Sequence, residues 1–124
     1  DDIEALVDDV RRSGLDVELV RSGKADDADA ATSLAAYRIV QESLTNVIKH
    51  SAAQTAQVTV AATPTAVDID VTDPGPARMS SGSSSGHGLL GLDERVRLVG
   101  GVLESGADHD GFRVHAVLPT GTHK

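Results

Sequence analysis

A glycine-rich turn, Gly86-His87-Gly88-Leu89-Leu90-Gly91, runs directly into an amphipathic pattern that predicts a helix from about Leu89 to Val99. Glycine lets a backbone approach a ligand closely, because it carries no side chain. The first N–H groups of the following helix have no partner inside the helix, and with the helix dipole they favour an anion. On its own this stretch is a weak indication of a phosphate-binding turn.

A second polar group lies on the longest predicted helix, from about Asp29 to His50. We expect its apolar face to consist of Leu34, Tyr37, Val40, Leu44, Val47 and Ile48. The opposite side carries four polar residues within roughly 80° of one another. These are Arg38, Glu42, Asn46 and Lys49. Taken alone, such a set is usually a solvated surface. The functional alternative is that Asn46 gives Mg²⁺ a neutral oxygen, Glu42 polarises a water or hydroxyl, and Lys49 meets a phosphate.

The third polar feature is Asp73-Pro74-Gly75, which follows a predicted strand over about Ala66–Thr72. Asp73 keeps the alternation of the apolar residues in that strand and therefore points toward the core, where a carboxylate is costly unless it is hydrogen-bonded. Two interpretations stay open. Asp73 caps the turn that follows, or it accepts a hydrogen bond from an exocyclic amine such as that of adenine, with Gly75 leaving room for the ring. The three features together predict a site for an adenine nucleotide and its magnesium ion.

The remaining patterns complete one domain, residues 1–124. A helix is expected at Ile3–Val10 and is closed by Gly14. Further strands are expected at about 15–19, 56–62, 102–105 and 112–118, where apolar residues alternate with polar ones. This order suits a two-layer α/β sandwich, in which a mixed, mostly antiparallel sheet is covered by helices on one face.

Composition narrows the functional classes. Aromatic residues make up only 2% of the chain, so the core has to be aliphatic. The absence of cysteine excludes disulfides and thiolate chemistry. A net charge of −8 argues against a general nucleic-acid surface. No apolar run approaches the roughly 20 residues of a membrane span, and no signal-peptide pattern is present. Because the chain begins at Asp1 without a methionine, we expect it to be part of a longer protein.

The histidines give no sign of a metal site. All five are scattered, and none has a histidine partner three or four residues away. His115 is expected on the solvent face of the last strand and His109 in the hairpin turn before it. A zinc site is therefore not expected.

In this order the three features resemble the motifs of the GHKL ATPase superfamily, whose nucleotide-binding domain has the Bergerat fold. Residues 37–50 resemble the N box, Asp73-Pro74-Gly75-Pro76 the first glycine box, and residues 86–91 the second. The sequence is most similar to bacterial sensor histidine kinases of the NarX/DesK-like group, which act with NarL-type response regulators. Residues 92–96, 100–101 and 111–114 also match that group.

The resemblance implies a domain that binds Mg-ATP and donates the γ-phosphoryl group to a histidine on a separate dimerisation domain. Glu42 would be the catalytic carboxylate and Asn46 the Mg²⁺ ligand. Lys49 and His50 would approach the phosphates, and Asp73 with Gly75 would contact adenine. The phosphate end would be lined by Gly86, His87, Gly88, Leu89 and Gly91.

The resemblance also implies a short ATP lid at Ala77–Ser85. Pro76 stands where the first glycine box usually has its second glycine, so the lid is expected to leave the site at a different angle. We expect this domain to lie in the cytoplasm, whether or not the full-length protein is anchored in a membrane, and no direct membrane or nucleic-acid contact is expected of the domain itself.

No His-Asp or His-Glu pair lies on a predicted helix, so the phosphoacceptor is absent from these 124 residues. We expect the catalytic domain alone, joined to the rest of the protein through the helix at Ile3–Val10. Two alternatives stay open. One is an anti-sigma-factor serine kinase of the same fold, and the other is a non-catalytic nucleotide-binding module that acts by docking. Intact Glu42, Asn46 and Asp73 argue against the second.

Overall fold

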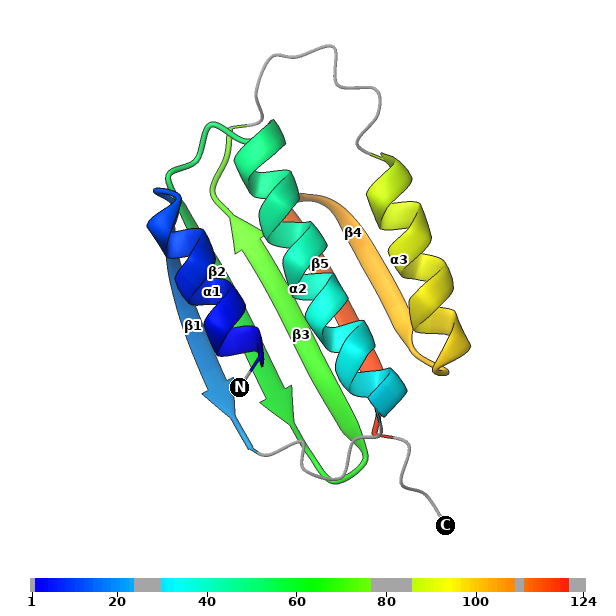
Figure 1. Cartoon of the computed structure of the whole chain (residues 1–124). Helices are drawn as coiled ribbons and strands as arrows, with labels where there is room; N and C mark the ends of the chain where they lie inside the picture. The colour runs from blue at the N-terminus through cyan, green and yellow to red at the C-terminus, as the bar shows by residue number, and fades with distance from the viewer. Residues whose placement is uncertain (1, 24–29, 77–85, 109–110, 121–124) are drawn as a thin grey trace.

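The computed structural model describes residues 2–23, 30–76, 86–108 and 111–120 of the chain. Within them a five-stranded sheet has the strand order β1-β2-β3-β5-β4, and three helices pack on one of its faces (Figure 1). β1 is parallel to β2, and the other neighbouring strands are antiparallel. The elements are α1 (Asp2–Arg12), β1 (Asp16–Ser22), α2 (Ala30–His50), β2 (Thr55–Ala62), β3 (Ala66–Asp73), α3 (Gly86–Leu98), β4 (Val102–Asp108) and β5 (Gly111–Pro119). The expected two-layer α/β sandwich is confirmed.

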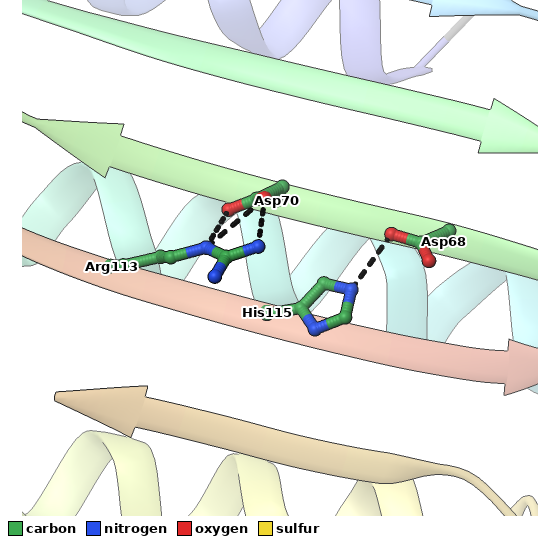
Figure 2. Close-up of polar contacts among 4 residues, drawn as sticks. All are labelled: Asp68, Asp70, Arg113 and His115. Atoms are coloured by element: carbon green, nitrogen blue, oxygen red, sulfur yellow. Dashed lines mark hydrogen bonds and ion pairs between the residues drawn. The ribbon is translucent and has the colours of Figure 1, made fainter.

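The alternation along β3 divides the two faces of the sheet. Its helix-facing side carries Val67, Ile69, Val71 and then Asp73, all of them buried. Its other side carries acidic residues that pair with residues of β5, as Figure 2 shows. Arg113 donates from Nε and one terminal nitrogen to the carboxylate of Asp70, and His115 Nε2 lies 2.9 Å from Asp68 Oδ1. The predicted position of His115 on the solvent side is confirmed.

The apolar face predicted for α2 is partly wrong. Val40, Leu44 and Val47 are buried as expected, but Leu34 and Ile48 are 44% and 40% exposed. The face toward the sheet instead includes smaller side chains, which are Thr32, Ala35, Ala36 and Ser43, together with Ile39. Small residues let a helix lie close to a sheet, and an apolar-pattern count gives them little weight. The buried face is therefore rotated about the helix axis relative to the predicted one.

Several element boundaries also differ from the prediction, and β1 continues as far as Ser22 instead of residue 19. Helix α3 begins at Gly86 rather than Leu89, so the glycine-rich segment forms the first helical turn instead of a turn before it. The hairpin strands are longer than predicted, because β4 and β5 stay paired as far as Asp108 and Gly111. His109 lies outside the described residues. None of the described helices is long and apolar enough to cross a lipid bilayer.

Candidate functional site

The three polar features meet at one end of the sheet. Figure 1 shows the C-terminal ends of α2 and β3 and the first turn of α3 at the same end of the molecule. The direction of α2 is fixed at the other end, where Thr32 Oγ1 donates to the carbonyl oxygen of Pro119 at the end of β5. Helices α2 and α3 also contact each other. These contacts bring segments that are far apart in the sequence to the same end of the sheet.

Asp73 is the best-defined residue of this site. The residue is only 8% exposed, and its Oδ1 atom accepts hydrogen bonds from Ser51 Oγ at 2.8 Å and from the Gly75 backbone N–H at 2.7 Å. The second bond is the turn cap that one of our two interpretations predicted. Both bonds go to Oδ1, which leaves Oδ2 without a partner among the residues that the structure describes. The turn cap therefore leaves one oxygen of the carboxylate available for a further hydrogen bond.

The turn after Asp73 is fixed against the end of α2. Gly75 has a φ of +69°, a conformation that side chains other than glycine rarely adopt, and the Gly75-Pro76 peptide bond is cis. The carbonyl oxygen of Pro76 accepts a hydrogen bond of 2.8 Å from the Ala52 N–H. The expected lid, Ala77–Ser85, lies outside the described residues, so the predicted effect of Pro76 on its direction stays a prediction.

The polar residues of α2 differ in how far they are exposed to solvent. Glu42 and Asn46 are half-buried, whereas Arg38 and Lys49 are exposed. Arg38 donates to the side-chain oxygen of Gln41 on the same helix, at 3.0 Å. Glu42 and Asn46 thus lie at the border between core and solvent, where a bound ligand can reach them. The backbone of His50 ends α2, and its side chain lies outside the description.

The described residues could supply a magnesium ion with only a minority of its ligands. Among the described residues no group of three or more His, Cys, Asp or Glu side chains is placed to hold a metal. Mg²⁺ commonly uses only one or two protein oxygens and takes its other ligands from phosphates and water. A half-buried amide oxygen on Asn46 fits that pattern, and it is the residue that would hold the ion.

The glycine-rich segment contributes backbone groups at the start of α3. Gly86, His87, Gly88 and Leu89 form the first turn of this helix, and their side chains lie outside the description. Gly91, one turn further, is exposed. The N–H groups of a first helical turn have no partners within the helix, whether or not a loop precedes it. The earlier helix start therefore keeps the anion-binding capacity that the sequence predicted.

Two residues that hold Asp73 in place were missed by the sequence analysis. Ser51 is buried just after α2, and only its contact with Asp73 reveals its role. Gly111 begins β5 so close to β3 that a Cβ atom there would lie 1.8 Å from the Asp73 carbonyl oxygen. Gly111 could have been noticed, because it is a glycine directly before a strand with alternating apolar residues. No feature of the sequence indicates the role of Ser51.

Two known proteins are similar in sequence to this chain. The sensor histidine kinase YxjM of Bacillus subtilis is 33% identical over 110 residues, which cover 87% of this chain and 27% of that protein. The sensor histidine kinase DesK of the same organism is 36% identical over 81 residues, covering 64% and 22%. The chain thus spans about a quarter of the length of these relatives.

The fold has close counterparts among solved structures. The ATP binding domain of PrrB from Mycobacterium tuberculosis superposes with a TM-score of 0.68 at 22% identity, covering 98% of this chain and 93% of that one. A family model described as histidine kinase-, DNA gyrase B- and HSP90-like ATPase matches residues 31–122, which include α2, Asp73 and the start of α3. The chain belongs to this ATPase family.

Proposed function

We propose that this chain is the ATP-binding catalytic domain of a sensor histidine kinase. It binds Mg-ATP in the cytoplasm and donates the γ-phosphoryl group to a histidine on a separate dimerisation domain, and a NarL-type response regulator receives the group from there. The family match and the two sensor-kinase relatives support the class of protein. The arrangement of α2, Asp73 and α3 at one end of the sheet supports the proposed nucleotide site.

The observation that carries the proposal is the state of the Asp73 carboxylate. A carboxylate that is 8% exposed needs hydrogen bonds, and the residues that the structure describes supply them to Oδ1 alone. Oδ2 is left to accept a hydrogen bond from a ligand. The exocyclic amine of adenine is a donor of the right kind, and a charged acceptor strengthens such a bond.

Each of the other proposed site residues has its own role at the triphosphate. The Asn46 amide oxygen holds the magnesium ion, which neutralises charge on the phosphates when bound. Glu42 lies one turn before Asn46 and polarises the incoming nucleophile or a water. Lys49 meets a phosphate as a point charge, and His50 lies beside it. The backbone N–H groups of residues 86–89 line the phosphate end, where positioning and charge stabilisation supply most of the catalysis.

An exchange of hydrogen-bonding groups tests the role of Asp73. In Asp73→Asn, Oδ1 can still cap the turn, but the second side-chain atom becomes an N–H donor that faces the adenine amine. Loss of a hydrogen bond to a charged group costs about 1.5–3 kcal/mol. We therefore expect ATP affinity to fall about 10- to 150-fold. Inosine triphosphate carries a carbonyl oxygen in place of the amine, and it should lose less affinity or gain some.

Titration calorimetry with ATP and inosine triphosphate provides the measurement. Asp70→Asn is the matched control, because Asp70 lies on the same strand with its side chain on the opposite face. We expect it to leave both affinities unchanged. If Asp73→Asn binds ATP as tightly as the parent chain, Asp73 is a turn cap only and the proposed base contact is wrong.

A further inference from the structure

An aromatic residue lies opposite the proposed base-contacting residue on the neighbouring strand. In the antiparallel pairing of β3 with β5, Asp73 is opposite Phe112, and in the pairing of β5 with β4, Phe112 is opposite Ala107. Opposed residues on antiparallel strands share one face, with Cβ atoms about 4.5–5.5 Å apart. Phe112 therefore lies on the helix-facing side of the sheet, next to Asp73 and near the start of its strand.

The ring of Phe112 is not covered as its neighbours are. Val114, Ala116 and Leu118 continue the same side of β5, and each is at most 2% exposed. Phe112 is 37% exposed, although it belongs to the same row. Phe112 is also the chain's single phenylalanine. A large apolar side chain left half-open at the end of an otherwise buried row is a surface for a ligand to cover.

The backbone that carries the ring is packed tightly against the backbone of Asp73. Gly111 precedes Phe112, and a Cβ atom at Gly111 would lie 1.8 Å from the Asp73 carbonyl oxygen and 2.8 Å from the Pro74 carbonyl carbon. This close approach presses the start of β5 against the Asp73-Pro74 backbone. The backbone positions that carry the phenyl ring and the Asp73 carboxylate are thus held beside each other by main-chain packing.

We propose that Phe112 is a specificity-determining residue, and that its ring forms the apolar wall against which the purine base packs. The inference rests on the proposed function, since it requires a base at Asp73. A purine held through its amine at Oδ2 has a flat apolar body that needs cover from water. Phe112 supplies that cover from the neighbouring strand, and Asp73 supplies the polar contact.

Alanine substitution tests the contact. Stacking of a base on an aromatic side chain is worth about 1–3 kcal/mol. We therefore expect Phe112→Ala to weaken Mg-ATP binding about 5- to 150-fold. Binding of magnesium tripolyphosphate, which has no base, should be unchanged in the same variant. Phe112→Leu keeps apolar volume without the ring and should lose less affinity than Phe112→Ala.

A matched control is available on the same strand. Val117 is also 37% exposed but lies on the opposite face of β5, so Val117→Ala should leave both affinities unchanged. Because the chain has one phenylalanine, selective labelling gives a single set of ring signals in NMR. We expect nuclear Overhauser contacts between these signals and the adenine H2 or H8 proton in the unsubstituted chain.

The outcomes separate this inference from the proposed function. If the unsubstituted chain does not bind Mg-ATP, the proposed function fails and the inference falls with it. If ATP binds but the ring shows no contact with the base, or Phe112→Ala binds ATP equally well or more tightly, the inference alone is wrong. An equal loss of ATP and tripolyphosphate binding would also overturn it, because the ring would then act through the whole site.

Discussion

By our proposal, the Asp73 side chain serves both the fold and a ligand. Its Oδ1 atom joins the end of α2, through Ser51, to the turn at Gly75. Burial of an ionised group is tolerated because these two donors replace water. An apolar residue at this position would leave the Ser51 hydroxyl and the Gly75 N–H without this acceptor. The structural role thus explains why the carboxylate stays in place when no nucleotide is bound.

The proposed metal contact of Asn46 makes a separate prediction. Asn46→Ala removes the half-buried amide oxygen of α2 that we assign to magnesium. We expect the affinity for Mg-ATP to fall far more than the affinity for ATP measured with excess chelator, since the metal-free nucleotide does not use this oxygen. Calorimetric titrations with and without magnesium provide the comparison.

Gln41→Ala is the control for that experiment. Gln41 is also a half-buried amide residue on α2, but its oxygen accepts a hydrogen bond from Arg38. Both nucleotide forms should bind this variant as they bind the parent chain. An equal loss in the presence and absence of magnesium for Asn46→Ala would contradict the metal assignment and leave Asn46 as a contact to the nucleotide itself.

At the scale of the element, α2 can be tested by two substitutions of identical chemistry. Leu44 is fully buried and Leu34 is 44% exposed, although the sequence placed both on one apolar face. Leu44→Ala should lower the free energy of unfolding by about 2–5 kcal/mol, because it leaves a cavity in the core. Leu34→Ala should lower it by less than about 1 kcal/mol.

Urea denaturation followed by circular dichroism measures both changes, and an unchanged dependence on urea concentration checks that the unfolded states are comparable. Similar losses for the two variants would mean that the helix packs on the face predicted from the sequence. The rotated face seen in the structure would then be wrong, and with it the half-buried placement of Glu42 and Asn46.

The elements themselves show which features a sequence can predict. The strands followed from alternation, because side chains of period two mark one buried face, and Asp73 was placed on that face by the same rule. Helix α2 was predicted, but its buried side was not, since alanine and serine weigh little in an apolar pattern. The predicted start of α3 was three residues too late, because glycine favours a loop over the first turn of a helix.

At the scale of the whole molecule, the contacts that could not be predicted from the sequence are those that depend on strand pairing. The contact between Ser51 and Asp73 spans 22 residues, and the pairing of Asp73 with Phe112 requires β5 to lie beside β3 in a particular register. Neither follows from a local pattern. The order β1-β2-β3-β5-β4 brings these residues together, so the apolar wall that we propose for the base forms only in the complete sheet.

The last prediction concerns this chain as a partner in phosphoryl transfer. By our proposal it supplies the nucleotide, the magnesium ion and Glu42, whereas the acceptor imidazole comes from a separate helical dimer. Transfer needs a nucleophile in line with the γ-phosphate, and positioning supplies much of the rate. Of the five histidines, His115 is engaged with Asp68 on the opposite face of the sheet. We expect the chain to remain unlabelled when it is incubated with γ-labelled ATP.

Addition of a sensor-kinase dimerisation domain that carries its own histidine should produce an acid-labile, base-stable phosphate on that domain. Glu42→Gln should retain ATP binding and lose most of this transfer, because it removes the carboxylate while preserving size. Gln41→Ala, one residue away on α2, should transfer at the parental rate. A phosphohistidine mapped within residues 1–124 would contradict this division of labour, since the acceptor would then lie in the same domain as the nucleotide.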